Sequence, residues 1–493
     1  MKRRNFLLTS AALGGATLIG ASNLYSYDVF EQERDFSLPP LYEGKFTNGK
    51  RVFNLNLQHG EMEFFKGLKT KTLGINAPFL GPTLRAKKGE FIQINVKNSL
   101  RFDSTLHWHG FELPAKMDGG PHQVIKPDTT WKPEFKVQNR ASFLWYHSHM
   151  FHQTATQVYK GLAGMFIIDD EESSSLNLPS EYGIDDIPIV LQDRNFNSDG
   201  SFRYITSMQE RMAGFHGNYV LVNGVIAPTF KAKKKLTRFR ILNGSNARFY
   251  NLGFSDDRDF KLIATDGGLL EAPVNLKQIR LAPGERIEIV VDLSNAQDVV
   301  LKSFKGATRS MGMMGMMMGS MNSDIEFDLM KIKSKNASTS TRTIPSKLSE
   351  HPVWNPNNAV AARGMTLSMG MMSMMGGGGN GDRFFINGKA MDMSRIDAVA
   401  KKDTFEIWKI VNQSPMAHPF HVHNTQFKIL AIDGRRPNKS EQGFKDTVIV
   451  DPMGAVYIMV SFKYNSDKNV PYMFHCHILE HEDGGMMGQF LVT

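Results

Sequence analysis

The sequence predicts an all-β protein composed of three β-sandwich domains. Short runs that alternate apolar and polar residues recur along most of the 493-residue chain and are separated by Gly, Pro and Asn. The gaps between the runs are too short for crossover helices, so the pattern favours antiparallel sandwiches over βαβ units. At about 150 residues per domain, the length accommodates about three domains. The predicted strands cover residues 51–57, 91–96, 143–146, 165–168, 187–191, 238–242, 287–291, 405–411 and 456–462.

Two changes in composition divide these strands into three units. One change lies near residues 171–175 and the other lies across residues 332–345, where polar residues replace the apolar alternation. Such polar segments between periodic regions are typical of linkers. We therefore expect domains at residues 40–172, 173–335 and 345–493.

The composition is that of a globular protein and excludes several kinds of site. Hydrophobic residues make up 41 % of the chain, and the 43 glycines bring the apolar share to about half. The single cysteine excludes an intramolecular disulfide, a four-cysteine zinc site and a cysteine-bound iron–sulfur cluster. The formal charge is +9, but the one basic run, at residues 231–235, has no interleaved aromatic residues. We therefore expect no nucleic-acid partner.

The first 22 residues have the pattern of an export signal. Basic residues at positions 2–4 precede a modestly apolar stretch that ends in small residues. Several Gly, Ser and Thr residues make this stretch too polar and too short for a stable membrane span, so we expect no membrane insertion of the mature chain. Paired arginines before Asn5-Phe6-Leu7 resemble a twin-arginine signal, which exports proteins already folded around a cofactor. An ordinary secretory signal is the alternative, and both readings predict a periplasmic protein.

Ten of the fifteen histidines fall in four clusters confined to the first and last predicted domains. Residues i and i+2 of a strand point to the same face, so each His-x-His pair can offer two imidazoles to one side. A single pair is most often structural, but four pairs from two domains indicate one shared interdomain metal site. The clusters are His107-Trp-His109, His147-Ser-His149, His418-Pro-Phe-His421-Val-His423 and His475-Cys476-His477 with His481 beyond.

Cys476 predicts a second, separate metal site. In an extended strand its side chain points away from His475 and His477, so the thiolate and these imidazoles cannot share one metal. A thiolate, two imidazoles and a weak, long thioether form a blue-copper electron-transfer site. The spacing assigns His418, Cys476, His481 and Met486 to it. Eight imidazoles remain, which suit a cluster of three metals: His107, His109, His147, His149, His421, His423, His475 and His477.

These motifs resemble those of the multicopper oxidases, the three-domain, laccase-like enzymes, over nearly all of the mature chain. The resemblance implies three cupredoxin-like Greek-key β-sandwiches and four copper ions. It places type-1 copper at His418, Cys476, His481 and Met486, type-2 copper at His107 and His421, and a type-3 pair at His109, His147, His149, His423, His475 and His477. Copper is also preferred over zinc because zinc cannot pass electrons between the two sites.

The resemblance also implies the reaction. A donor would lose one electron at the type-1 site, the electron would travel through Cys476 to His475 or His477, and four such electrons would reduce O₂ to two waters. Asp118 and Glu482 match acidic positions that in this family help protons or water reach the trinuclear site. Ordinary solvent-exposed acids are the alternative for both.

Methionine is unusually frequent, with 29 residues and two dense clusters at 311–321 and 365–375. The interspersed glycines predict exposed, flexible loops, and exposed thioethers are soft ligands that select Cu(I). The loops resemble those of bacterial cuprous oxidases, and Met369 and Met416 fall where that subgroup holds its substrate copper. The chain departs from the subgroup because Ser414 stands near Met416 and no acid lies within 365–375.

The leading hypothesis is therefore an exported, monomeric multicopper oxidase that acts on Cu(I) and serves copper tolerance. Its partners would be a metal ion or small molecule together with O₂. A laccase or ferroxidase with phenolic or Fe(II) donors is the nearest alternative, and a non-catalytic copper-sequestering protein is another. A two-domain nitrite reductase is disfavoured because all six type-3 histidines are present.

Overall fold

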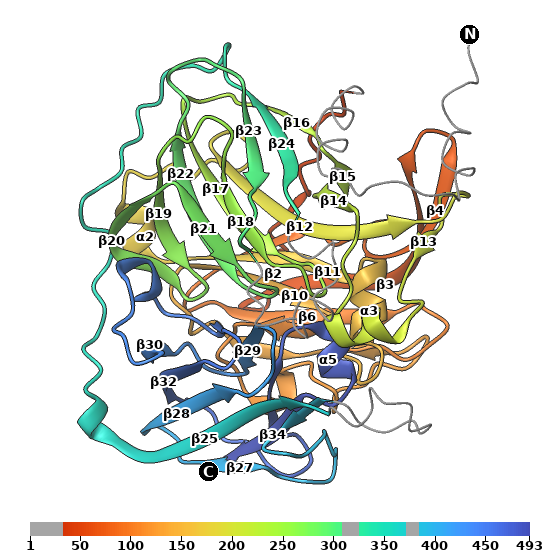
Figure 1. Ribbon diagram of the computed structural model, residues 1–493, viewed down its shortest axis with the longest axis vertical. Helices are drawn as coiled ribbons and strands as arrows, with labels where there is room; N and C mark the ends of the chain where they lie inside the picture. Colours follow the sequence, from red (N-terminus) through yellow and green to blue (C-terminus); the bar gives the residue numbers. More distant parts are fainter. Residues whose placement is uncertain (1–32, 308–324, 371–383) are drawn as a thin grey trace, which may run out of the picture.

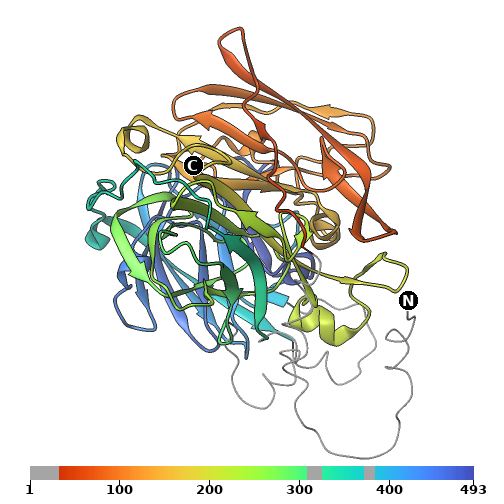
Figure 2. The same cartoon turned by 90° about the horizontal axis from the view of Figure 1, so that it is seen from above.

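The computed structural model describes residues 33–307, 325–370 and 384–493. Within these ranges six β-sheets form three two-sheet sandwiches, which confirms the predicted all-β class (Figure 1). Figure 2 shows the first sandwich beside the other two, so that each sandwich borders both of its neighbours. None of the described helices is long and apolar enough to span a membrane. The predicted export signal and the methionines at 311–321 and 371–375 lie outside the described residues.

Sandwich 1 contains a five-stranded sheet and a six-stranded sheet. The five-stranded sheet has the order β1 (Leu41–Tyr42), β5 (Thr83–Lys87), β11 (Ala163–Asp169), β10 (Ser142–His147) and β7 (His107–His109). The other has the order β2 (Lys45–Thr47), β3 (Lys50–Phe65), β6 (Phe91–Asn98) and β8 (Thr130–Trp131), with β4 (Leu68–Ile75) on β3 and β9 (Glu134–Lys136) on β6.

Sandwich 2 contains an eight-stranded sheet and a five-stranded sheet. The larger has the order β15 (Val225–Ile226), β14 (Tyr219–Val222), β12 (Asp186–Phe196), β17 (Leu236–Asn243), β22 (Arg286–Asp292), β19 (Phe260–Thr265) and β20 (Gly268–Leu276), with β13 (Phe202–Arg203) on β12. The smaller has the order β16 (Thr229–Lys231), β24 (Phe327–Lys333), β23 (Val299–Ser303), β18 (Tyr250–Phe254) and β21 (Gln278–Leu281).

Sandwich 3 contains two five-stranded sheets. One has the order β26 (Phe384–Ile386), β25 (Ala359–Met369), β28 (Phe405–Asn412), β32 (Ala455–Ser461) and β30 (Lys428–Ile432). The other has the order β27 (Ala398–Ala400), β34 (Met487–Val492), β33 (Tyr472–Cys476), β29 (His418–Val422) and β31 (Thr447–Val450).

The sandwiches, expected to be antiparallel, are mixed, because each of the six sheets also contains a parallel pair. A parallel pair needs a crossover connection, and here strands of the opposite sheet supply it in place of helices. In sandwich 1, for example, the chain leaves β3 and visits β5 in the facing sheet before β6 pairs with β3. The parallel pairs include β3–β6, β5–β11, β12–β17, β16–β24, β25–β28 and β27–β34.

Helices are short and lie at the junctions between sandwiches. Among the described residues they are α1 (Thr154–Lys160), α2 (Glu171–Ser175), α3 (Met208–Ala213) and α5 (Leu479–Asp483), with 3₁₀ turns η1 (Ala115–Met117), η2 (Pro356–Asn358) and η4 (Lys439–Glu441). The first expected linker is thus helix α2 rather than open loop, because the Asp170 carboxylate accepts the backbone N–H of Ser173 at 2.8 Å and caps it. The second runs along sandwich 2 to reach sandwich 3, and buried Leu348 packs against sandwich 2 (Figure 1).

A buried apolar layer joins sandwich 1 to sandwich 2. Strands β10 and β11 bury both faces, one toward the core of sandwich 1 and the other toward sandwich 2. The β3–β4 hairpin adds Phe64, whose ring lies 5.5 Å from Phe79, 5.3 Å from Phe196 and 5.4 Å from Phe202 between ring centroids. This aromatic contact fixes the position of the first two sandwiches relative to each other.

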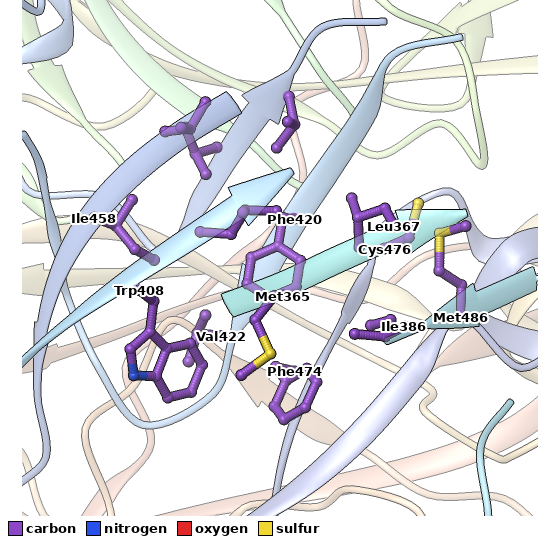
Figure 3. Packing of buried hydrophobic residues seen from close by; sticks show 14 of the residues in the cluster. Met365, Leu367, Ile386, Trp408, Phe420, Val422, Ile458, Phe474, Cys476 and Met486 are labelled. Atoms are coloured by element: carbon purple, nitrogen blue, oxygen red, sulfur yellow. The ribbon is translucent and has the colours of Figure 1, made fainter. Parts of the chain in front are cut away.

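The start of the second methionine cluster is strand and not loop. Met365 and Leu367 alternate with solvent-facing residues along β25, and the Met365 side chain is buried in the core of sandwich 3 (Figure 3). The expectation of an exposed loop was therefore wrong for Met365, because strand periodicity directs it inward. Met369 ends the strand and is partly buried against the same core.

Replacing Phe64 with Ala should lower the free energy of unfolding by about 3–5 kcal/mol, because the substitution leaves a cavity between sandwiches 1 and 2. Chemical denaturation followed by fluorescence measures the change. The control is Phe46→Ala, since Phe46 is 61 % exposed and its loss should cost no more than about 0.5 kcal/mol. Equal effects of the two substitutions would contradict a structural role for the aromatic contact.

Candidate metal centres

The mononuclear site is formed by two strands and a short helix of sandwich 3. His418 begins β29, Cys476 ends β33 and His481 lies on α5, and all three side chains are buried. The Nδ1 of His418 lies 3.4 Å from Cys476 Sγ, the Nδ1 of His481 lies 3.8 Å from it, and the two Nδ1 atoms are 3.3 Å apart. Met486 follows α5 and belongs to the same buried cluster as Cys476 (Figure 3).

Hydrogen bonds orient both imidazoles of this site. The Nε2 of His481 donates to the carbonyl oxygen of Met212 at 3.0 Å, so its Nδ1 carries a lone pair that faces the sulfur. The Nε2 of His418 lies 2.7 Å from the Ser414 hydroxyl, which leaves its Nδ1 turned the same way. Outer partners of this kind fix the tautomer and the direction of a metal-binding imidazole.

Burial determines the charge of these groups. It lowers the pKa of His418 to about 3 and the pKa of His481 well below its ordinary value, so both rings are neutral at pH 7. Burial also raises the pKa of the Cys476 thiol. The thiolate therefore needs a bound cation, and a copper ion coordinated by the sulfur would supply that charge.

The second site gathers eight histidines between sandwiches 1 and 3. They lie on or directly after β7, β10, β29 and β33, whose registers pair His107 with His147 and His421 with His475. The Nε2 of His475 lies 3.3 Å from that of His149 and 3.2 Å from that of His423. The residues are His107, His109, His147, His149, His421, His423, His475 and His477, and none is more than 1 % exposed.

Half of these eight imidazoles are held from behind by backbone carbonyl oxygens. Four Nδ1 atoms donate to backbone: His107 to Asp118 (2.9 Å), His147 to Ser148 (2.8 Å), His421 to Asp446 (2.8 Å) and His475 to Cys476 (3.1 Å). The Nε2 atoms of His107, His147 and His421 consequently point inward and have no hydrogen-bond partner among the described residues. His109 is reversed, because its Nε2 contacts Asp446 and its Nδ1 is left without a partner.

The donor set fits copper. Burial lowers the pKa of all eight histidines, which are therefore neutral ligands at pH 7. Buried polar atoms without partners are costly, and several here converge in three-residue groups whose ligand atoms lie within 4.8 Å of one another. Neutral imidazole nitrogens suit copper, and a bound ion would satisfy each orphaned lone pair.

The two predicted acids lie beside these histidines and are buried, so the reading of Asp118 and Glu482 as solvent-exposed acids was wrong. Asp118 Oδ2 lies 2.7 Å from His423 Nδ1, and its carbonyl holds His107. The carboxylate of Glu482 lies 3.3 Å from His149 Nδ1 and 3.2 Å from His475 Nδ1. Burial raises the pKa of both carboxyls well above their ordinary values.

Sequence reasoning missed Asp446, which contacts two of the histidines. Its Oδ1 lies 3.0 Å from His109 Nε2, and its backbone carbonyl accepts the Nδ1–H of His421. No spacing pattern marks this residue. The one available signal is a charged pair, Lys445-Asp446, directly before the apolar strand β31.

Fold and site together define a class of protein: a copper enzyme in which one strand links a thiolate–imidazole site to an all-imidazole site. Three segments of the chain, residues 56–173, 183–305 and 365–493, match the multicopper oxidase family. The chain belongs to this family. It is therefore an oxidoreductase with copper cofactors and O₂ as its electron acceptor.

The chain is similar in sequence to proteins of two kinds, multicopper oxidases and cell division proteins. The multicopper oxidase mco of Staphylococcus aureus is 40 % identical over 453 residues, which cover 91 % of this chain and 90 % of that protein. Cell division protein FtsP of Escherichia coli (strain K12) is 33 % identical over 495 residues, which cover 100 % of this chain and 99 % of that protein.

Solved structures show the same fold. The laccase-like multi-copper oxidase CueO from the lignin-degrading bacterium Ochrobactrum sp. has a TM-score of 0.84 and 36 % identity, covering 93 % of this chain and 100 % of that chain. The McoA multicopper oxidase of Aquifex aeolicus has a TM-score of 0.81 and 33 % identity, covering 94 % of this chain and 99 % of that chain.

The copper-free protein should lose stability as the pH falls from about 6.5 toward 4. Unfolded histidine titrates near 6.5, whereas burial lowers the pKa of His475 to about 4 and of His418 to about 3. The unfolded chain then binds more protons than the folded one, so each such histidine lowers the free energy of unfolding by about 1.4 kcal/mol per pH unit.

Raised pKa values of buried carboxyls act in the opposite direction, but eight such carboxyls are outnumbered by the ten site histidines together with His216 and His351, whose pKa values are also lowered. Thermal unfolding of chelator-treated protein across this pH range measures the effect. Copper-loaded protein is the control, because bound metal competes with protons and should flatten the slope. A melting temperature of the copper-free protein that stays constant between pH 6.5 and 4 would contradict neutral, buried histidines.

Proposed function

We propose that this protein is a periplasmic, monomeric cuprous oxidase that holds four copper ions and serves copper tolerance. The observation that carries the choice of Cu(I) as donor is that Met369 and Met416 are each separated by one residue from an imidazole of the mononuclear site, Met369 by Phe384 and Met416 by Ser414. The remaining support comes from the ligand geometry and from the burial of the site.

The four ions are assigned to the two groups of side chains. His418, Cys476, His481 and Met486 would hold type-1 copper. His107 and His421 would hold type-2 copper, and the type-3 pair would be held by His109, His147, His149, His423, His475 and His477. When bound, the copper ions would accept electrons one at a time and deliver four of them to O₂, which takes up four protons and becomes two waters.

Strand β33 provides the connection between the two groups. Cys476 faces the mononuclear site, while the adjacent His475 faces His149 and His423 in the other. Only the backbone of neighbouring residues separates the thiolate from the imidazoles. The chain thus supplies a short covalent route for electrons that passes through no solvent.

Met369 is separated from His481 of the mononuclear site by Phe384. Met369 and Phe384 pair in register between β25 and β26, and the Phe384 ring stacks on His481 with centroids 4.2 Å apart. Met416 is linked to the other imidazole of the site, that of His418, through Ser414. Its carbonyl accepts the Ser414 hydroxyl at 3.1 Å, and that hydroxyl contacts His418. Thioethers are soft ligands that select Cu(I), so the two methionines fit a cuprous donor at the edge of this site.

Burial of the mononuclear site favours a small donor. His418 and His481 are both fully buried, and the outer nitrogen of each is bonded to protein. A phenol therefore has no exposed imidazole edge to contact in this conformation, whereas a metal ion held by thioethers could donate across the intervening residues. Organic or Fe(II) donors remain the alternative outcome of the kinetic test.

Asp118 and Glu482 are placed to supply protons. Asp118 Oδ1 has no hydrogen-bond partner among the described residues, and burial raises the pKa of this carboxyl, which favours its protonated form. Glu482 lies within 3.3 Å of the Nδ1 atoms of His149 and His475, which Asp118 does not contact. The two carboxyls can thus hold protons beside different histidines of the site where O₂ is reduced.

Replacing both Met369 and Met416 with Leu should raise the KM for Cu(I) by about 10- to 100-fold, the usual cost of disturbing a metal's surroundings. The kcat/KM for a phenolic donor should not change, because the type-1 ligands are intact. Steady-state O₂ uptake with each donor measures the effect. Met453→Leu is the control, since Met453 is 62 % exposed and lies outside the cluster. Equal losses with both donors, or none with Cu(I), would contradict a cuprous site here.

Replacing Cys476 with Ser should abolish the intense blue absorption and O₂ consumption together, because the thiolate ligand and the electron route are both lost. The near-ultraviolet band of the type-3 pair should remain and shows that the variant is folded. A wild-type protein that binds copper and consumes no O₂ would indicate a sequestering or other non-catalytic role. The full-length similarity to FtsP, which bears a cell-division name, makes that comparison necessary.

A further inference from the structure

One buried arginine of sandwich 2 contacts all three sandwiches beside the eight-histidine site. Arg286 begins β22 and is fully buried. Its Nε donates to the carbonyl of Phe143 in sandwich 1 at 3.0 Å. Its Nη1 and Nη2 donate to the two oxygens of Asp446 in sandwich 3 at 2.7 and 2.6 Å, and Nη2 also reaches the carbonyl of Asp266 at 3.1 Å.

Arg286 thereby determines where the Asp446 carboxylate lies. The same Oδ1 that accepts from Arg286 lies 3.0 Å from His109 Nε2, and Oδ2 also accepts from Gln426 at 2.8 Å. Unlike the histidines whose Nδ1 atoms bond to backbone carbonyls, His109 is held through its Nε2 atom. Its Nδ1 atom therefore points toward the site. The orientation of this one ligand therefore depends on a carboxylate that a bidentate guanidinium holds in place.

The turn before Arg286 touches a second histidine of the site. Gly284 has φ of +84°, and a Cβ at this position would lie 2.9 Å from the Cγ and Cδ2 atoms of the His477 ring. Its carbonyl accepts Arg286 Nη1 at 3.1 Å, so the glycine and the arginine form one unit. His477 has no hydrogen-bond partner for either ring nitrogen among the described residues, and contact with this turn is one of the features that positions its ring.

We propose that Arg286 and Gly284 of sandwich 2 are positioning residues for the trinuclear site, although none of the proposed metal ligands lies among the described residues of sandwich 2. Arg286 acts through Asp446 on His109, and Gly284 acts by contact on His477. Both histidines are assigned to the type-3 pair, so the inference rests on the proposed copper assignment but not on the identity of the electron donor.

The Arg286–Asp446 ion pair packs tightly against the backbone next to His109. A Cβ at Gly110, directly after His109, would lie 2.6 Å from Asp446 Oδ2 and 2.7 Å from Arg286 Nη2, so the ion pair lies directly against the ligand's own backbone. Lys445 and Glu285 continue the buried charge network at 3.0 Å. Without the guanidinium the carboxylate would lose its bidentate anchor and keep only the Gln426 amide and the Thr447 hydroxyl as partners, so the His109 ring would be held less firmly.

Replacing Arg286 with Met in the full-length, copper-loaded protein tests this role. Copper content per chain and the absorption spectrum are read without any donor, so the result is independent of turnover. We expect the visible thiolate band to stay within about a fifth of the wild-type value and the near-ultraviolet band to fall at least threefold. Copper per chain should fall from about four to two or fewer. Gly284→Ala should weaken the near-ultraviolet band by displacing His477.

Arg240→Met is the matched control. Arg240 is equally deep in sandwich 2 and pairs with Asp186 and Glu288, but neither partner touches a predicted ligand. This variant should keep the wild-type ratio of the two bands. Arg286→Lys retains the charge without the bidentate contact, so it should lose part of the near-ultraviolet band and serves as the test if the Met variant does not fold.

Two outcomes would separate the inference from the proposed function. An Arg286→Met protein with the wild-type ratio of bands would overturn the role of Arg286 and leave the copper assignment intact. A wild-type protein that lacks the near-ultraviolet band would overturn both. Equal loss of this band in the Arg240 and Arg286 variants would show a general effect of burying an unpaired carboxylate and would also overturn the specific role.

Discussion

The alternation of side chains along one extended strand is the constraint on which both metal sites depend. On β33 the thiol of Cys476 and the imidazole of His475 emerge on opposite faces. The sulfur consequently meets His418 and His481 inside sandwich 3, whereas the imidazole meets His149 across the boundary with sandwich 1. The covalent link between the sites thus comes from strand geometry, and everything else positions the remaining ligands around it.

That geometry requires ten imidazoles to be buried in a neutral state. Burial lowers the pKa of each, and neighbouring imidazoles at the larger site lower them further. Several inward nitrogens have no partner among the described residues, which is costly in a protein interior. Bound metal offsets this cost. The folded chain is accordingly organised around cofactors, and the outer nitrogens are bonded so that the inner ones have a defined direction.

Sandwich 2 contributes to both sites, although none of its described residues is a proposed metal ligand. The carbonyl of Met212 orients His481 in one, and Arg286 with Gly284 supports His109 and His477 in the other. Apolar layers on either side hold it against sandwich 1 and sandwich 3. Because sandwich 2 packs against both of the others, sandwiches 1 and 3 can share one site although they are far apart in the sequence.

The sequence by itself determined the positions of nine strands, the all-β class and the set of histidines that converge. Period-2 alternation and His-x-His spacing are local properties, so a short window contains all the information they need. The parallel pairing, the reversed ring of His109 and the roles of Asp446 and Arg286 came only from the tertiary structure. Asp446 and Arg286 are 160 residues apart, and nothing near either one marks a partner. The burial of Met365 on β25 also came from the tertiary structure, because the sequence predicted an exposed loop there. Contacts between distant segments depend on how sandwiches pack together, which local residue patterns do not encode.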